Sequence, residues 1–600
     1  MRQTNQVTYR KSAQPLLLKN HQPTAPGEYD IYPAYSLGER KIEHGFHPLA
    51  SRLIGHTYIA IDGYVGVLWS QFQAQLDRAL QSHGMRANWV SVDQALQRAE
   101  EIEALIEPFL GGDDPIFGTR FTGTLSDFFD IRSLGQKPDH RQSDMVIYYG
   151  TGAALFAGDA YLIYVDIPKN EIQYRARAGS IHNLGATEAA DPGMMYKRFY
   201  FVDWVALNAH KATLLPKMDL YVDEQDPETP SIISGDVLRD SLVDMSHNYF
   251  RVRPWFEPGP WGGQWMKEHI PQLAEDVPNY AWSFEMIAPE QGIVLESSGK
   301  LLEISFDLLM AHDARAILGN HAGQFGQQFP IRFDFLDTFR GGNLSVQCHP
   351  RPSYIRQQFG ENFTQDETYY ILDTKPDAKV YLGFQDGVDR TEFRSALESS
   401  FRDGTPVEID RFVKALPSEK HGLFLIPNGT IHCSGTDNLV LEISATPYIF
   451  TFKMYDWLRL DLQGKPRPLN IQRAFDNLYF ERRGELVERE LVSRPNLLEA
   501  GEDWQIFHLP THPSHFYDVH RIEFDTSVSV RTEGSPHLLM LVEGTSLRLE
   551  TCNGKSQRFN YAETFVVPAA AECYRLINEG RTPAKVVKAF LKPNWNKPGE

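Results

Sequence analysis

The chain has 600 residues, a length that predicts two or three domains, each with its own hydrophobic core. Hydrophobic residues make up 42% and charged residues 23% of it, which argues against a disordered or fibrous protein. The formal net charge of -19 disfavours nucleic acid and anionic membranes as partners, because both require clustered Lys and Arg. A small anionic substrate would need a locally basic pocket.

The sequence contains no apolar run of about 18 residues or more, so we expect no membrane span. Its first residues, MRQTNQVTYRKSAQ, lack the hydrophobic core of a secretion signal. The four cysteines are too few for a disulfide framework in a chain of this length. These features predict a cytoplasmic protein.

Residues 1–45 are polar and contain several prolines, which predicts an extended N-terminal arm that packs on the surface. Strand-like runs at 58–61, 89–92 and 161–165 then alternate with helical stretches. Such alternation is typical of a parallel α/β sheet. We expect this α/β domain to extend over residues 46–235.

The segment Ile61–Ser70 lies where a strand leads into a helix, which is the usual position of a phosphate-binding loop. It resembles the P-loop of uridine-kinase-like nucleoside kinases. The matching residues are Asp62, Gly63, Gly66 and Ser70. Trp69 replaces the lysine that reaches the terminal phosphates, and Leu68 replaces the glycine before it. The segment therefore predicts a degenerate kinase-like domain, either without a ligand or acting as a nucleotide or phosphate sensor without transfer activity.

Beyond a boundary near 236–248, short alternating runs separated by Gly, Pro and Asn predict mainly β structure. Helical inserts are expected around 305–328 and 389–416, where apolar residues have helical spacing. We expect one β domain at 248–500 and another at 501–600. The expected fold class is thus multidomain, a P-loop-like parallel α/β sheet followed by β barrels with helical inserts.

The run 344–350 alternates like a strand, so three polar side chains share one face. These are Ser345, Gln347 and His349. Glu367 follows later, and His432 comes just after a tight turn at 427–431. Two imidazoles, a carboxylate and an amide oxygen from separate strands can surround a divalent cation and leave positions open for a substrate.

These motifs resemble the class I mannose-6-phosphate isomerases. The matching runs are LSVQCHP, PNGTIH, LVLEIS, MYDW and GKPRPLNIQRA. The resemblance extends from about residue 250 to the end and implies two cupin (β jelly-roll) barrels, the second of them without a metal. It also implies interconversion of mannose 6-phosphate and fructose 6-phosphate through an enediol, with one Zn²⁺ per chain. The implied zinc ligands are Gln347, His349, Glu367 and His432.

Proton transfer in such an isomerase requires a positioned base. The resemblance makes Glu442 the leading candidate, and a carboxylate that only orients His432 is the alternative. Lys453 stands where the family usually has a catalytic arginine. It keeps the positive charge but loses bidentate geometry.

The resemblance implies that Ser345 contacts the substrate phosphate. Two lysines common in the family are replaced by Asp334 and Gln365. Three other basic residues can compensate as substrate-binding groups. They are Arg332, Arg459 and Lys465.

Three hypotheses follow. The first is an active zinc isomerase of a sugar phosphate that carries an inactive kinase-like domain. The second is a regulatory protein in which both domains have lost catalysis and the cupin senses a sugar phosphate. The third is a cupin isomerase that acts on a different or unphosphorylated sugar. Retention of all four metal ligands favours the first hypothesis, and loss of basic positions favours the other two.

Overall fold

The computed structural model describes residues 9–133, 143–287, 289–446, 449–460, 467–593 and 595. The chain divides into two compact units. The first unit comprises the described parts of Met1–Pro23, Tyr32–Met245 and Pro289–Asp313. The second comprises the described parts of Thr24–Ile31, Ser246–Ala288 and Ala314–Glu600. The segment Pro289–Asp313 thus belongs to the first unit, although it lies within the expected 248–500 domain.

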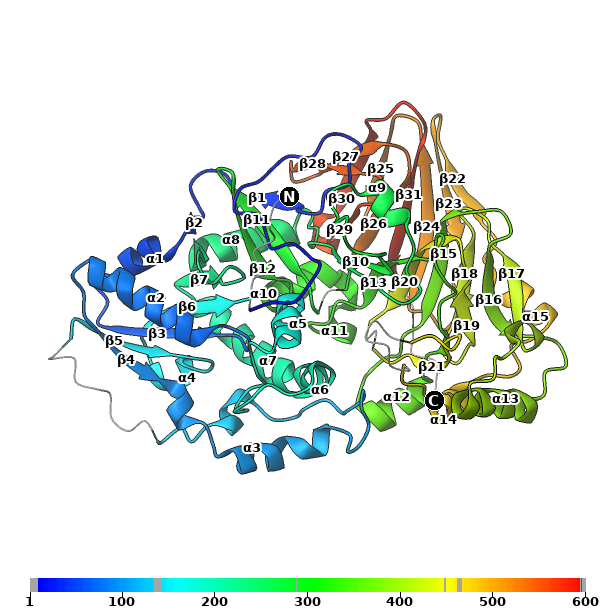
Figure 1. Cartoon of the computed structure of the whole chain (residues 1–600). Helices are drawn as coiled ribbons and strands as arrows, with labels where there is room; N and C mark the ends of the chain where they lie inside the picture. Colours follow the sequence, from blue (N-terminus) through cyan, green and yellow to red (C-terminus); the bar gives the residue numbers. More distant parts are fainter. Residues whose placement is uncertain are drawn as a thin grey trace. The chain divides into compact units, whose positions relative to one another are not determined.

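A seven-stranded sheet with the order β2-β8-β7-β6-β3-β5-β4 forms the centre of the first unit (Figure 1). Strands β3 to β7 pair in parallel, whereas β7, β8 and β2 pair antiparallel at one edge. The strands are β2 (Glu43–His44), β3 (Tyr58–Gly63), β4 (Ala87–Ser91), β5 (Met145–Tyr149), β6 (Tyr161–Asp166), β7 (Leu220–Asp223) and β8 (Ser231–Ser234). The parallel core agrees with the alternation of strands and helices in the sequence.

The helices of this unit pack through apolar residues at helical spacing. In α2, Phe72, Leu76 and Leu80 are 1%, 0% and 0% exposed and belong to the core of the sheet. The helices are α1 (Phe46–Leu53), α2 (Trp69–Ser82), α3 (Ala99–Ile106), α4 (Ala154–Ala157), α5 (Lys169–Ala178), α6 (Pro192–Arg198), α7 (Trp204–Leu214) and α8 (Gly235–Ser246). A small sheet joins β1 (Ala34–Ser36), β11 (Gly292–Ser297) and β12 (Lys300–Ser305).

Two sheets form the first part of the second unit. The six-stranded sheet has the order β18 (Leu423–Ile426), β15 (Glu367–Thr374), β20 (Asn438–Ala445), β13 (Ile331–Asp337), β10 (Trp282–Met286) and β9 (Trp255–Glu257). The five-stranded sheet has the order β17 (Val413–Pro417), β16 (Lys379–Phe384), β19 (His432–Ser434), β14 (Val346–Cys348) and β21 (Phe452–Tyr455). Helices interrupt this β structure: α9 (Trp265–His269), α10 (Asp307–Leu318), α11 (Ala322–Phe325), α12 (Pro352–Phe359), α13 (Arg390–Asp403), α14 (Ile471–Asn477) and α15 (Glu485–Glu490).

The C-terminal part of the second unit also consists of two sheets. One has the order β22 (Asn496–Ala500), β23 (Trp504–Leu509), β24 (Tyr517–Phe524), β31 (Ala584–Leu591), β26 (His537–Glu543) and β29 (Thr564–Val567). The other has the order β25 (Ser527–Arg531), β30 (Cys573–Asn578), β27 (Ser546–Thr551) and β28 (Ser556–Asn560).

The four cysteines have different states. Cys552 and Cys573 form a disulfide, with their Cα atoms 5.6 Å apart, a bond that the cysteine count does not predict. Cys348 and Cys433 are free and buried. Among the described residues, no helix is both long and apolar enough to cross a membrane.

Candidate metal centre

Three side chains from the two sheets meet at one point. Glu367 begins β15, His432 begins β19, and His349 directly follows β14. Glu367 Oε2 lies 2.6 Å from His349 Nε2 and 3.1 Å from His432 Nε2. All three side chains are buried, and one ligand atom of each lies within 4.8 Å of the others. Three of the four expected ligands are therefore close enough to share one cation.

Backbone carbonyls orient both imidazoles. His349 Nδ1 lies 3.3 Å from the Phe450 carbonyl oxygen, and His432 Nδ1 lies 3.0 Å from that of Thr430. A carbonyl only accepts hydrogen bonds, so each Nδ1 carries the proton and each Nε2 keeps its lone pair. This arrangement is the usual support of a histidine that binds a metal.

The charge and the hydrogen bonds of the cluster fit a divalent cation. Burial lowers the pKa of His349, which favours the neutral imidazole that binds metals. Burial raises the pKa of Glu367, but His349 and His432 pull this pKa well below its ordinary value, so the carboxylate is ionised. Glu367 Oε1 is buried without a hydrogen-bond partner among the described residues. A cation would satisfy this oxygen, and the nitrogen and oxygen donors are those that Zn²⁺ accepts.

Gln347 completes the expected set from the middle of β14. It lies opposite His432 in the register, and its Nε2 is 3.3 Å from His432 Nε2. The two terminal atoms of an amide exchange places by a half-turn of the side chain, so the amide oxygen can occupy the same position. Gln347 is therefore arranged to supply a fourth donor.

The turn before His432 depends on a glycine. Gly429 has a φ of 71°, and a Cβ there would lie 2.5 Å from the Asn477 carbonyl oxygen. Its N–H donates to the His349 carbonyl oxygen over 2.9 Å. Only glycine suits this conformation and this close approach, so the PNGT sequence links two of the histidine-bearing segments.

Glu442 belongs to a buried ion-pair network next to the cluster. Arg332 binds its Oε1 and also lies 3.1 Å from Asp334 Oδ1. Ser444 Oγ donates to Glu442 over 2.8 Å, and Gln365 Nε2 lies 3.4 Å away. Burial raises the pKa of both Asp334 and Glu442, although Arg332 opposes both shifts. The guanidinium of Arg332 is thus engaged by two carboxylates of its own chain.

Lys453 lies on the same sheet as two of the expected ligands. It is opposite Gln347 across β14 and β21, so both side chains extend from the same face of the sheet. Burial and the nearby Arg467 and Arg459 lower its pKa to about 7, although Asp456 opposes this shift. The ammonium group therefore titrates near neutral pH.

A second group of charged residues surrounds Ser345. Its hydroxyl donates to Asp456 Oδ1 over 2.6 Å. Arg459 Nη2 lies 2.7 Å from the same carboxylate oxygen, and Arg467 Nη1 lies 3.0 Å from Asp456 Oδ2. Arg467 also lies 3.3 Å from the Ser345 hydroxyl, a contact that the sequence analysis missed. Lys465, which the sequence analysis included, lies outside the described residues.

In the first unit, two carboxylates bind N–H groups of the segment that resembles a phosphate-binding loop. Asp62 accepts hydrogen bonds from the N–H groups of Gly63, Gly152 and Ala154 over 2.6, 2.8 and 2.9 Å. Glu224 accepts one from the Leu68 N–H and pairs with Arg175 over 2.6 Å. Each carboxylate therefore binds one N–H group of this segment, that of Gly63 or of Leu68, whereas Gly152 and Ala154 belong to the region after β5.

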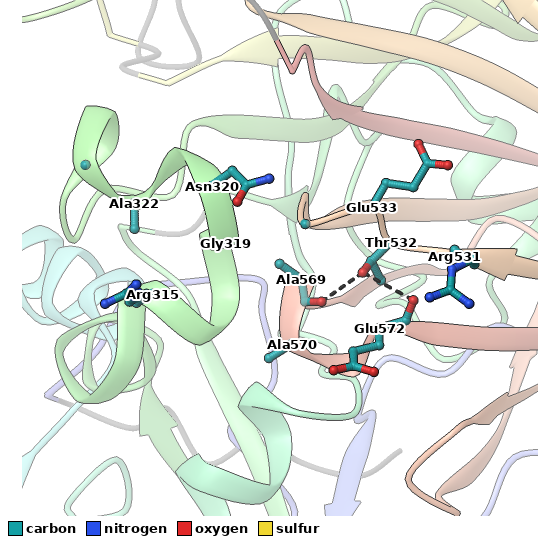
Figure 2. A pocket seen from close by; sticks show the side chains of 12 residues that line it. Arg315, Gly319, Asn320, Ala322, Arg531, Thr532, Glu533, Ala569, Ala570 and Glu572 are labelled. Atoms are coloured by element: carbon teal, nitrogen blue, oxygen red, sulfur yellow. Dashed lines mark hydrogen bonds between the residues drawn. The ribbon is translucent and has the colours of Figure 1, made fainter.

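A polar cavity of about 910 Å³ lies elsewhere in the second unit. Figure 2 shows Arg315 and Asn320 on its helical side and Arg531 and Glu533 on its β side. None of the expected metal-binding, catalytic or substrate-binding residues lines it. This cavity is therefore distinct from the candidate metal centre.

Comparisons with known proteins divide the chain in two. Residues 45–247 match a domain family of unknown function, DUF8485. A probable mannose-6-phosphate isomerase, GmuF of Bacillus subtilis (strain 168), is 27% identical over 328 residues, which cover 54% of this chain and 94% of that protein. The mannose-6-phosphate isomerase of Streptococcus mutans serotype c is 25% identical over 36% of this chain and 64% of its own length.

A mannose 6-phosphate isomerase from Bacillus subtilis has a TM-score of 0.47 and 18% identity, covering 57% of this chain and 99% of that one. A TM-score below 0.5 does not by itself establish a shared fold. The sequence relatives are isomerases, which confirms the expected enzyme class. Over about half of its length, the chain is thus similar to mannose-6-phosphate isomerases.

Proposed function

We propose that the chain is a zinc-dependent mannose-6-phosphate isomerase of the cupin type. The observation that carries this proposal is the convergence of Glu367 with the Nε2 atoms of His349 and His432, each imidazole being held by a carbonyl at Nδ1. The similarity to proteins named mannose-6-phosphate isomerase supports the same reaction. One Zn²⁺ would be held by Gln347, His349, Glu367 and His432.

Isomerisation of an aldose to a ketose moves a proton between C1 and C2 while negative charge develops on oxygen. Bound zinc would supply Lewis-acid stabilisation of that charge. Glu442 is our candidate for the group that moves the proton, because it lies in the buried network beside the cluster and burial raises its pKa well above that of an ordinary carboxyl group. Arg332, Ser444 and Gln365 hold its carboxylate in place.

Lys453 is our second catalytic candidate. A lysine with a pKa of about 7 can donate or accept a proton at physiological pH. Its position opposite Gln347 directs it to the face of the sheet that carries the proposed zinc ligands. In this role it would take the place of the arginine found in related enzymes.

For the phosphate of the substrate we propose Ser345 and Arg459, together with Arg467. Arg332 is less suited to this role, because it binds Asp334 and Glu442. Asp456 already binds Ser345, Arg459 and Arg467, so a phosphate would have to compete with this carboxylate. That observation favours a second candidate function, in which the same centre isomerises an unphosphorylated sugar.

For the first unit we propose a degenerate kinase-like domain without transfer activity. Trp69 is at the position of the missing lysine. Its indole packs against Gly63 so closely that a Cβ on this glycine would lie 2.9 Å from the ring. Asp62 and Glu224 accept hydrogen bonds from the Gly63 and Leu68 N–H groups, so two donors of the segment are bound by carboxylates of the chain itself. These contacts support a structural role for the segment.

The test is a coupled assay of ketose formation from mannose 6-phosphate and, in parallel, from mannose. It would use the purified protein, the same protein after chelation, and the chelated protein after zinc is restored. Loss and recovery of turnover with mannose 6-phosphate are expected. Turnover of mannose alone would favour the second candidate. Folded, zinc-loaded protein that converts neither sugar would contradict both.

A further inference from the structure

The turn Pro427–Thr430 contacts all three segments that carry the candidate metal ligands. Gly429 N donates to the His349 carbonyl oxygen over 2.9 Å. Asn428 donates from its N–H and from Nδ2 to Asp366 Oδ1, over 2.7 and 2.9 Å, and Asp366 directly precedes Glu367. The Thr430 carbonyl accepts the hydrogen bond of His432 Nδ1. A displacement of this turn would therefore disturb the whole cluster.

One side chain from a distant part of the sequence binds this turn at several points. Arg482 Nη1 lies 3.0 Å from the Pro427 carbonyl oxygen and 2.5 Å from that of Asn428, and it also contacts the Thr430 hydroxyl. The Thr430 hydroxyl in turn donates to the Pro427 carbonyl. The guanidinium thus binds acceptors at both ends of the turn, which fixes its shape as well as its position.

We infer that Arg482 is a positioning residue for the metal ligand His432, acting through the turn Pro427–Thr430. The inference rests on the proposed zinc centre and adds a residue that neither binds the ion nor touches the substrate. Arg482 holds Thr430, the Thr430 carbonyl fixes the Nδ1 side of His432, and the Nε2 side of the imidazole then faces Glu367. Residues that orient a ligand in this way contribute to metal affinity.

The surroundings of Arg482 hold the guanidinium rigidly. Its Cζ lies 4.6 Å from the centre of the Tyr479 ring, a cation–π geometry. The backbone N–H of Tyr479 donates to the Gly429 carbonyl over 2.9 Å, so the residue that carries the stacked ring is bonded to the turn through its main chain. Burial lowers the pKa of Arg482 only to about 10, and the side chain stays charged at neutral pH. The three contacts with the turn all come from Nη1, so a lysine ammonium could donate to the same acceptors, but it has no planar group to stack on the Tyr479 ring.

Arg390 offers a matched control in the same region. Its Nη2 donates to the Phe475 carbonyl over 3.1 Å, and its Cζ lies 5.3 Å from the Phe480 ring centre. It therefore resembles Arg482 in donating to a backbone carbonyl and stacking on an aromatic ring. The described contacts of Arg390 do not include the turn Pro427–Thr430.

The experiment measures zinc affinity by chelator competition in the full-length protein, comparing wild type, Arg482→Gln, Arg482→Lys and Arg390→Gln. We expect Arg482→Gln to weaken zinc binding by about 10- to 100-fold, Arg482→Lys to recover part of the loss, and Arg390→Gln to bind like wild type. With Co²⁺ in place of zinc, the visible absorption bands should shift in Arg482→Gln and not in Arg390→Gln. The milder variant Thr430→Val removes the two contacts of the hydroxyl, with Arg482 and with the Pro427 carbonyl, and leaves the other contacts of Arg482 in place. It should show a smaller loss and serves if Arg482→Gln does not fold.

Two outcomes separate the inference from the proposed function. Wild-type protein that binds no zinc at all would contradict the proposed zinc enzyme, and the positioning role with it. Wild-type protein that binds zinc, with variants at Arg482 and Thr430 that bind it equally well and give an unchanged Co²⁺ spectrum, would overturn the positioning role alone.

Discussion

Asp334 and Glu442 lie opposite each other on the neighbouring strands β13 and β20, and Arg332 forms ion pairs with both carboxylates. The three residues are 5% exposed or less. Two buried carboxylates at opposite positions of neighbouring strands would repel each other if no cation lay between them. Arg332, which the sequence predicts to bind substrate, therefore compensates the charge of Glu442 next to the candidate metal centre.

Replacing Arg332 by Gln should destabilise the protein strongly, because it leaves two buried carboxylates without their cation. We expect a loss of about 3–5 kcal/mol in the free energy of unfolding, measured by denaturant titration. Arg340→Gln is the control, since Arg340 and its partner Glu268 are 53% and 51% exposed and should contribute less than about 1 kcal/mol. Equal, small losses of stability in both variants would show that Asp334 and Glu442 do not need the charge of Arg332.

The candidate ligands could be predicted from sequence because the signals are local. Gln347 lies in β14 and His349 directly follows this strand, and the glycine-containing turn before His432 marks the start of another strand. Strand alternation directs such residues to one face whatever the rest of the fold is. The structure indeed brings His349, Glu367 and His432 together.

Contacts that join distant segments could not be predicted in this way. The strands β11 and β12 have apolar patterns that fit any sheet. They belong to the first unit through the pairing of β11 with β1 and through hydrogen bonds of β12 with Asp166 and Asp223. Through the same pairing, Ala34–Ser36 of the expected N-terminal arm form a strand of this sheet. The residues that flank Arg467 and Arg482 in the sequence do not indicate the distant partners of these arginines, Asp456 and Thr430.

Lys453→Met should reduce catalysis without removing the metal. If the ammonium takes part in proton transfer, kcat should fall about 100- to 10,000-fold, while zinc content stays at one ion per chain. Lys453→Arg keeps the positive charge but does not release its proton near neutral pH, so we expect it to be impaired about as much as Lys453→Met. Lys379→Met, an exposed lysine on β16 of the same sheet, should behave like wild type. A Lys453→Met enzyme with normal kcat would exclude a catalytic role.

Zinc should raise the melting temperature of the wild-type protein, because an ion that binds only the folded state stabilises it. At a free zinc concentration of about 100 times Kd, the gain is about 2.7 kcal/mol. Glu367→Gln keeps the size of the side chain but removes the charge that pairs with His349 and His432, so the zinc-dependent rise should shrink or vanish. Glu268→Gln, at an exposed glutamate, controls for the loss of one charge. An undiminished rise in Glu367→Gln would mean that zinc binds elsewhere.

Glu290 should make the stability of the first unit depend on pH. Burial raises its pKa to about 7 from the ordinary 4.5, although Tyr196, Lys169 and Gln173 oppose the shift. The folded state therefore prefers the protonated form, so the stability that this group contributes is complete below pH 4.5 and is lost as the pH rises to about 7. The difference between a pKa of 4.5 and one of about 7 corresponds to at most about 3–4 kcal/mol of stability.

Glu290→Gln removes this titration while keeping an acceptor for the Tyr196 hydroxyl, which lies 2.7 Å from Glu290 Oε1. Relative to wild type, the variant should gain stability at pH 8 compared with pH 5, as measured by thermal unfolding at both values. Other groups titrate in both proteins, so they cancel in this comparison. Glu188→Gln, at an exposed glutamate, should follow wild type at both pH values. If the difference between Glu290→Gln and wild type is the same at pH 5 and pH 8, the carboxyl group of Glu290 does not titrate in this range, and its hydrogen bonds offset the effect of burial.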